Sequence, residues 1–238
     1  MAEQHIARAF DRDLEGIQAL VMKMGGMVET AIQDAATALE TRNEELAEGV
    51  RRNDRAIDAL EMKINEEAAR LIALRAPTAS DLRVVLSVMK IAGSLERVGD
   101  YAKNMAKRSQ ALGQLGVITG AGGSLRRMAK TVIEMLSDAL DAYAGRHLDL
   151  AQDVLARDRD VDQMYNALFR EFLTHMMEDP RNITACMHLH FIAKNTERMG
   201  DHATAIAEQV IYLITGVLPD DDRPKAESVA DLAPSAGH

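Results

Sequence analysis

The motif Glu-Arg-x-Gly-Asp-x-Ala occurs twice in this 238-residue chain, at residues 96–102 and again at residues 197–203. Between residues 91–106 and 192–207, which are offset by 101, eight of sixteen aligned positions are identical. In the preceding segments Asp54 aligns with Asp158 at an offset of 104. The three-residue difference fits an insertion or deletion near Pro77 and Pro180. The chain is therefore an internal duplication and has to fold as two copies of one unit.

Residues that break helices are rare and mark the boundaries within each copy. Pro77 and Pro180 are the two internal prolines, and the other three follow residue 216. Between these points and the glycine-rich stretch at 113–123, apolar residues recur at steps of three and four, as on one face of a helix. The pattern predicts six helices, at residues 5–41, 43–75, 78–112, 124–145, 147–177 and 180–215.

The predicted fold is all-α, with two tandem three-helix bundles. The bundles are expected at residues 1–112 and 124–215, with a glycine-rich linker at 113–123 and a disordered, proline-containing tail at 216–238. Aromatic residues make up only 3% of the chain and tryptophan is absent. Alanine, leucine, methionine, glutamate and arginine, which are strong helix formers, dominate instead.

Charge and hydropathy narrow the possible functions. The formal net charge is −9, which works against binding to nucleic acid. No run of about 18 apolar residues is long enough to span a membrane, and the first residues do not read as a secretory signal. The single cysteine, Cys186, excludes an internal disulfide. We therefore expect a cytoplasmic protein.

Each copy carries two pairs of acids at i, i+4 spacing. Like charges at this spacing cost a helix a few tenths of a kcal/mol, and the glycine between the acids of the repeated motif costs about 1 kcal/mol relative to alanine. Because both penalties recur at equivalent positions, we interpret the acids as a functional feature. They are Asp54, Asp58, Glu96 and Asp100 in the first copy, and Asp158, Asp162, Glu197 and Asp201 in the second.

The spacing around the internal proline predicts that the two pairs of a copy meet. Asp58 lies 19 residues before Pro77 and Glu96 lies 19 after it, so an antiparallel hairpin places them at one level. Four carboxylates at one level form a hard-oxygen site of the kind that binds iron, manganese, magnesium or calcium. The alternatives are solvated helix faces, or an ion-pair network that includes Arg97 and Arg198.

Other candidates are weaker. His190 lies on the same helix face as Glu197, but Met89 occupies its place in the first copy. We therefore interpret it as a core or groove histidine with its hydrogen bonds satisfied, and the alternative is a supplementary metal ligand. Cys186 aligns with Val85, which favours a small buried thiol. The Gly-Ala-Gly-Gly stretch at 120–123 lacks the preceding strand and the following Gly-Lys-Ser/Thr of a phosphate loop, so we interpret it as linker.

The sequences "ERVGDYAKNMA" and "ERMGDHATAIA", each preceded by an Asp-x-x-x-Asp pair, resemble the PhoU family over nearly the whole chain. The resemblance implies two three-helix bundles and a metal-binding motif on the eight acids, with iron favoured and manganese, magnesium or zinc possible. Two nearby positions differ between the copies, since Lys103 becomes Thr204 and Asn104 becomes Ala205.

The resemblance also implies a function. A protein of this family is expected to be a negative regulator of the phosphate-starvation response and of phosphate uptake, not an enzyme. It would relay the status of the phosphate ABC transporter to a sensor histidine kinase. Its expected partners are that kinase, the transporter ATPase subunit and a second copy of itself, with only peripheral, partner-mediated contact with the membrane. The alternatives are a helical adaptor without metal and a carboxylate-bridged di-iron enzyme, although the Glu-x-x-His motif of such enzymes is absent.

Overall fold

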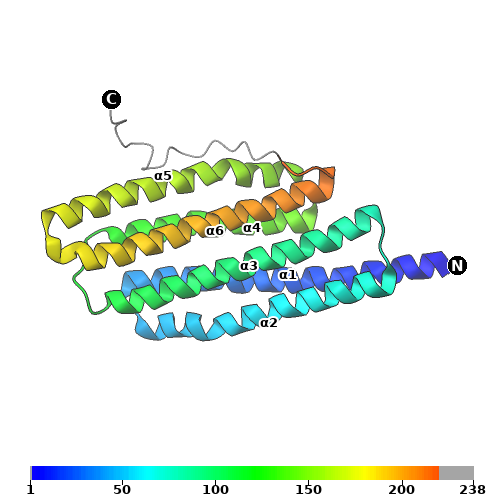
Figure 1. The fold of residues 1–238 in the computed structure, drawn as a ribbon, viewed down its shortest axis with the longest axis horizontal. Helices are drawn as coiled ribbons and strands as arrows, with labels where there is room; N and C mark the ends of the chain where they lie inside the picture. The colour runs from blue at the N-terminus through cyan, green and yellow to red at the C-terminus, as the bar shows by residue number, and fades with distance from the viewer. Residues whose placement is uncertain (1, 220–238) are drawn as a thin grey trace, which may run out of the picture.

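The computed structural model describes residues 2–219, with side chains from residue 9 onward, and consists of long helices that run side by side (Figure 1). Most of the tail predicted to be disordered, residues 220–238, lies outside the described residues. The elements are α1 (Ala2–Thr41), α2 (Glu44–Arg75), α3 (Ala79–Leu112), α4 (Ala121–Gly145), α5 (Leu148–Glu178), a 3₁₀ turn (Pro180–Asn182) and α6 (Ile183–Thr215). This arrangement confirms the predicted fold class.

The helix ends follow from local chemistry. The Asn43 side chain accepts a hydrogen bond from the Leu46 amide at 3.0 Å and so caps the start of α2. That helix ends where Ala76 adopts a left-handed backbone (φ 44°) and Pro77 follows. At the second corner, Asp179 caps the 3₁₀ turn that begins at Pro180.

The structure differs from the sequence prediction at the linker. Helix α4 begins at Ala121, so the Gly-Ala-Gly-Gly stretch belongs partly to the helix, and the predicted linker through residue 123 is too long at its end. The preceding residue, Gly120, has φ 86°, a left-handed conformation that glycine adopts without strain. Helix α4 can begin there despite two glycines in its first turn because it packs against α1 and α6.

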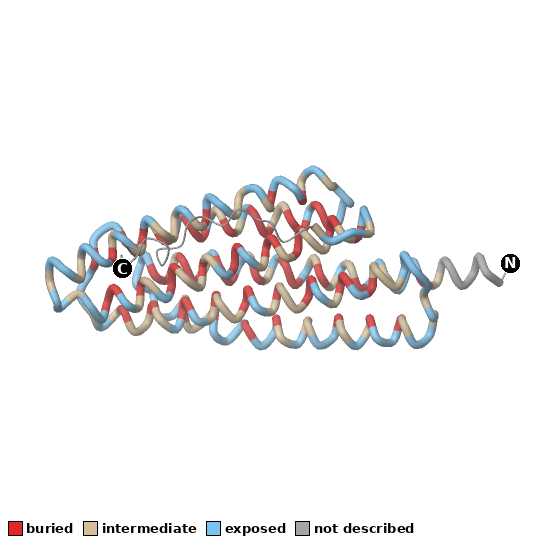
Figure 2. The backbone as a smooth tube through the Cα atoms, turned by 45° about the horizontal axis from the view of Figure 1, so that its top comes forward, coloured by how far each residue is buried: buried red, intermediate tan, exposed pale blue. Residues whose placement is uncertain are grey.

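The two halves are packed against each other along their length. Within each half the three helices contact one another, and between the halves α3 contacts α6 while α1 contacts α4. Buried residues lie along the inner sides of the helices, and exposed residues lie along the outer sides (Figure 2). The apolar core is contiguous through both halves. Among residues 2–219, no helix is long and apolar enough to cross a membrane.

Helices α3 and α6 run antiparallel across the contact between the halves. Near one end the Arg83 guanidinium lies 5.4 Å from the centre of the Tyr212 ring, and near the other Arg108 lies 4.3 Å from that of Phe191. In the middle the rings of Tyr101 and His202 are 5.8 Å apart. These two residues occupy equivalent positions of the duplication, because they differ by 101.

Candidate functional site

The structure brings the four acids of the first copy together, as their spacing predicts. We call Asp54 and Asp58 on α2 with Glu96 and Asp100 on α3 the first acidic cluster. Asp54 is buried, with 5% of its surface exposed, and the other three are half-buried. The Lys103 ammonium group donates to Asp54 Oδ2 at 2.5 Å and to Asp100 Oδ1 at 2.6 Å, so it joins the two helices.

The electrostatics of the first cluster show that its members act on one another. Burial, and then the charge of Asp54, raise the pKa of Asp58 above its usual range. Burial followed by the charge of Asp100 raises the pKa of Glu96. Burial opposes the charged form of Lys103, but its hydrogen bonds to Asp100 and Asp54 outweigh this and raise its pKa. The cluster therefore favours a cation at its centre.

The second acidic cluster consists of Asp158 and Asp162 on α5 with Glu197 and Asp201 on α6. The Glu197 side chain is 12% exposed and accepts a hydrogen bond from Lys194 Nζ at 2.6 Å. Burial raises the pKa of Glu197, and the charges of Asp201 and Asp162 add to that effect. Asp201 is exposed rather than directed into the helix contact, so this cluster is more open at one corner.

The glycine of each repeated motif lies in the contact between the two helices that carry the acids. A Cβ atom added to Gly99 would lie 3.3 Å from two side-chain carbons of Ile57, and one added to Gly200 would lie 3.3 Å from Val161 Cγ1. Ile57 and Val161 are themselves equivalent in the duplication, at the offset of 104. The glycines thus let α3 approach α2, and α6 approach α5, with the acids on either side of the contact.

The clusters fit a cation by their chemistry but are not preorganised around one. Within residues 2–219, no group of three or more His, Cys, Asp or Glu side chains is spaced to hold a metal ion as it stands. Yet Asp54 Oδ1 and Glu197 Oε2 are buried acceptors without a hydrogen-bond partner. A buried carboxylate oxygen left in this way is costly unless a cation or donor reaches it. In the first cluster the Lys103 ammonium stands in for such a cation.

The two lysines are the part of the site that the acidic pattern does not reveal. In the sequence, Lys103 is distinguished only by its difference from Thr204, and Lys194 only by its position three residues before Glu197. The i, i+3 spacing to an acid, Asp100–Lys103 and Lys194–Glu197, is the signal that indicates them.

His190 and Cys186 are placed largely as predicted. His190 is half-buried, with its ring 5.2 Å from that of Phe169 and 5.9 Å from that of Tyr165. Burial and then the charge of Lys194 lower its pKa. Its Nδ1 has no hydrogen-bond partner, so the expectation of a fully satisfied histidine is wrong for that atom. Cys186 is buried, and burial raises the pKa of its thiol.

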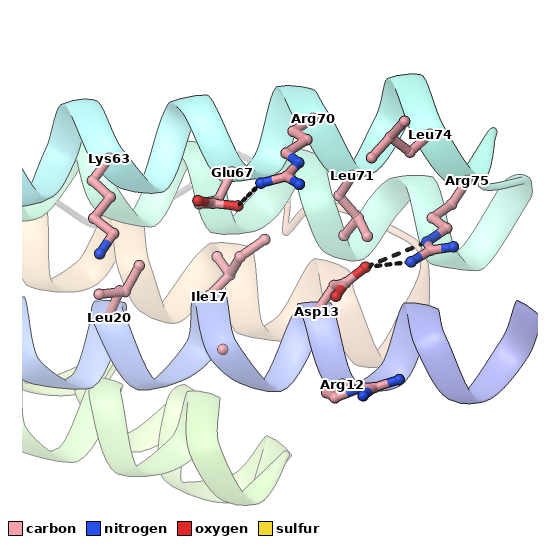
Figure 3. Close-up of a pocket in the computed structure, with 11 residues that line it drawn as sticks. Arg12, Asp13, Ile17, Leu20, Lys63, Glu67, Arg70, Leu71, Leu74 and Arg75 are labelled. Atoms are coloured by element: carbon pink, nitrogen blue, oxygen red, sulfur yellow. Dashed lines mark hydrogen bonds and ion pairs between the residues drawn. The ribbon is translucent and has the colours of Figure 1, made fainter.

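A separate hollow of about 420 Å³ lies between α1 and the C-terminal part of α2 (Figure 3). Its rim carries charges of both signs that pair with each other, Arg75 with Asp13 at 2.9 Å and Arg70 with Glu67 at 3.9 Å. The lining also includes Arg12 and Lys63, so its basic residues outnumber its acidic ones by two. We place the candidate site at the acidic clusters because they occur at equivalent positions of both copies.

Known proteins resemble this chain over nearly its full length. The model of the PhoU domain matches twice, at residues 21–109 and 125–210. A phosphate-specific transport system accessory protein PhoU homolog of Rhizobium meliloti (strain 1021) is 43% identical over 232 residues, covering 98% of both chains. The protein of the same name from Zymomonas mobilis is 47% identical, covering 98% of this chain and 96% of the relative.

Two solved structures have the same fold. The crystal structure of PhoU from Pseudomonas aeruginosa superposes with a TM-score of 0.85 at 40% identity, covering 87% of this chain and all of that one. The phosphate transport system regulatory protein PhoU from Streptococcus pneumoniae gives 0.82 at 32% identity, covering 89% of this chain and 99% of that one.

Proposed function

The chain belongs to the PhoU family, and from this premise we propose that it is a negative regulator of the phosphate-starvation response and of phosphate uptake. In this role it relays the status of a phosphate ABC transporter to a sensor histidine kinase. The proposal is supported most directly by sequence similarity. Proteins named as accessory to phosphate transport match 98% of the chain, including both repeats. Membership of a family of accessory proteins also confirms that the chain is not an enzyme.

The surface of the second half supports a role in binding partner proteins. Several large apolar side chains near the corner between α5 and α6 are exposed, namely Leu173, Met177, Ile183, Met187 and Phe191. Methionine side chains adapt to partners of different shape, and clustered exposed apolar residues mark interaction surfaces. The partners that we propose are the transporter ATPase subunit, the sensor kinase and a second copy of the chain, which meet in the cytoplasm at the membrane-bound transporter.

We further propose that the two acidic clusters bind metal ions, with iron first and manganese, magnesium or zinc as alternatives. The buried, unpartnered oxygens of Asp54 and Glu197 support this proposal. So do burial and, after it, the charges of the neighbouring acids, which raise the pKa of Glu96 and of Asp58. A bound metal ion would supply positive charge. The carboxylates would then tie α2 to α3 and α5 to α6 at the levels of Gly99 and Gly200.

Deletion of the gene tests the regulatory proposal. In phosphate-rich medium we expect a phosphate-starvation reporter to be switched on in the deletion strain, because nothing then signals that phosphate is plentiful. Restoring the gene should silence the reporter again. A reporter that stays silent in the deletion strain, with phosphate uptake unchanged, would show that this chain does not regulate the response.

Metal content tests the acidic clusters separately. Replacing Glu96 and Asp100 by Gln and Asn keeps side-chain size while removing two charges, and the same change can be made at Glu197 and Asp201. We expect each double variant to lose about half of the bound metal and the combined variant to lose all of it, because each cluster needs oxygens from both of its helices. Elemental analysis of the proteins, purified without a histidine tag, measures this.

Two exposed acids outside the clusters provide the matched control. Glu66→Gln on α2 and Asp160→Asn on α5 remove charge from the helices that carry the aspartate pairs of the clusters but not from the clusters themselves, so metal content should not change. The adaptor without metal is the competing function. Equal metal content in the wild type and in all cluster variants would favour it.

A further inference from the structure

Lys103 occupies the position between α2 and α3 where a bridging cation belongs. Its ammonium group hydrogen-bonds Asp54 of α2 and Asp100 of α3 at the same time, at 2.5 and 2.6 Å. Both are charge-assisted bonds, which are about twice as strong as neutral ones. A metal ion that used all four carboxylates of the first cluster would have to displace this ammonium group.

The second copy differs at this position. Its equivalent of Lys103 is Thr204, an uncharged residue whose hydroxyl donates to the Asp201 backbone carbonyl at 2.7 Å. The second copy has a lysine elsewhere, at Lys194, where the first copy has Gly93. Lys194 bonds Glu197 one turn along its own helix, and its ammonium group lies 5.1 Å from the centre of the Tyr165 ring. It is thus drawn toward the aromatic ring as well as toward one carboxylate.

We propose that Lys103 is a built-in competitor for the cation of the first acidic cluster, so that a metal ion binds there only by displacing its ammonium group. This inference rests on the proposed binding of metal at both clusters. Loading the first cluster requires the loss of two charge-assisted hydrogen bonds and the departure of a positive charge.

The same contact gives Lys103 a structural effect in the metal-free protein. Its bonds hold α2 and α3 together while no metal is bound, since one positive charge offsets part of the repulsion among the four acids. The first half therefore keeps its helix contact when metal is scarce.

Calorimetric titration of the metal-free, full-length protein with Mn²⁺ tests the proposal. Glu197→Gln with Asp201→Asn disables the second cluster, so that binding to the first is measured alone. In this background we expect Lys103→Thr, which copies the second half, to tighten Mn²⁺ binding by about tenfold or more, equivalent to roughly 1.4 kcal/mol. Lys103→Arg keeps the charge and should keep the weak binding. Unchanged or weaker binding in Lys103→Thr overturns the proposal.

Thermal melting separates competition from a merely structural role and remains informative if Lys103→Thr is less stable. If Lys103 competes with metal, Lys103→Thr melts lower than its parent in chelator and gains more than its parent when Mn²⁺ is added. If Lys103 is only a structural bridge, the deficit is the same with and without Mn²⁺, which overturns the proposal. Failure of the wild type itself to bind Mn²⁺, iron, Mg²⁺ or Zn²⁺ would instead refute the metal-binding part of the proposed function.

Discussion

Replacing Gly99 by alanine tests whether the repeated glycine exists to let two helices meet. Gly99 is buried inside α3, and a Cβ atom there would lie 3.3 Å from two carbons of Ile57, which is itself only 2% exposed. At this distance the isoleucine has to shift within a packed core.

Two opposing effects set the magnitude. Alanine is better than glycine in a helix interior by about 1 kcal/mol, whereas overpacking a core costs about 1–3 kcal/mol. The expected net change in the free energy of unfolding for Gly99→Ala is therefore about 0–2 kcal/mol of destabilisation.

Gly93 provides the matched control, because it lies in the same helix and a Cβ atom there would meet nothing within 4 Å. Gly93→Ala should gain up to about 1 kcal/mol. The two variants should thus differ by about 1–3 kcal/mol in urea unfolding with chelator present, provided that the slope with urea concentration stays the same. If Gly99→Ala is stabilised as much as Gly93→Ala, close approach of α2 and α3 is not the reason for the glycine.

Three further predictions concern other parts of the fold. Burial lowers the pKa of His190 and of His202 below 6.5, so the unfolded chain binds protons there that the folded chain does not. Stability should therefore fall as pH drops below 6.5. His190→Phe should weaken that dependence in urea titrations at several pH values. Asn43→Ala removes the cap of α2 and should cost about 1 kcal/mol, whereas a cost near zero would mean that water replaces the cap. Phe172→Ala removes a fully buried ring and should cost about 3–5 kcal/mol in the same unfolding assay; a cost below 1 kcal/mol would contradict its place in the core.

The helices and the meeting of the acids were predictable from the sequence because both depend on periodicity. Pro77 and Pro180 mark the two corners, and equal spacing on either side of Pro77 places Asp58 level with Glu96. The start of α4 was not predictable, because Gly122 and Gly123 normally interrupt a helix and are tolerated here by packing that a single sequence does not display.

The contact between the halves and the roles of Lys103 and Lys194 could not be predicted from the sequence either. An amphipathic stripe indicates that a helix face is buried but not which helix buries it, so the α3–α6 contact has no local signature. The Lys103 side chain could extend into solvent or toward α2. Its direction depends on where Asp54 lies in the folded chain. The metal-binding role of the eight acids remains a prediction for the same kind of reason, because ligand geometry depends on side-chain conformations that a bound ion would change.

The contact of Tyr101 with His202 bears on how such a chain arose. When a residue contacts its own equivalent in the other copy, the two copies are related by two-fold symmetry, and the same surface patch of each copy forms the contact. Arg198 lies 6.0 Å from the centre of the Tyr101 ring, and its counterpart Arg97 acts on the charge of His202, so the neighbours follow the same symmetry. The molecule therefore has the architecture of a homodimer whose two subunits have been fused head to tail. A gene for one copy alone would leave the buried face of its third helix open and would have to encode a self-pairing protein. In a fused chain the two sides can differ, and here one side has Lys103 where the other has Thr204.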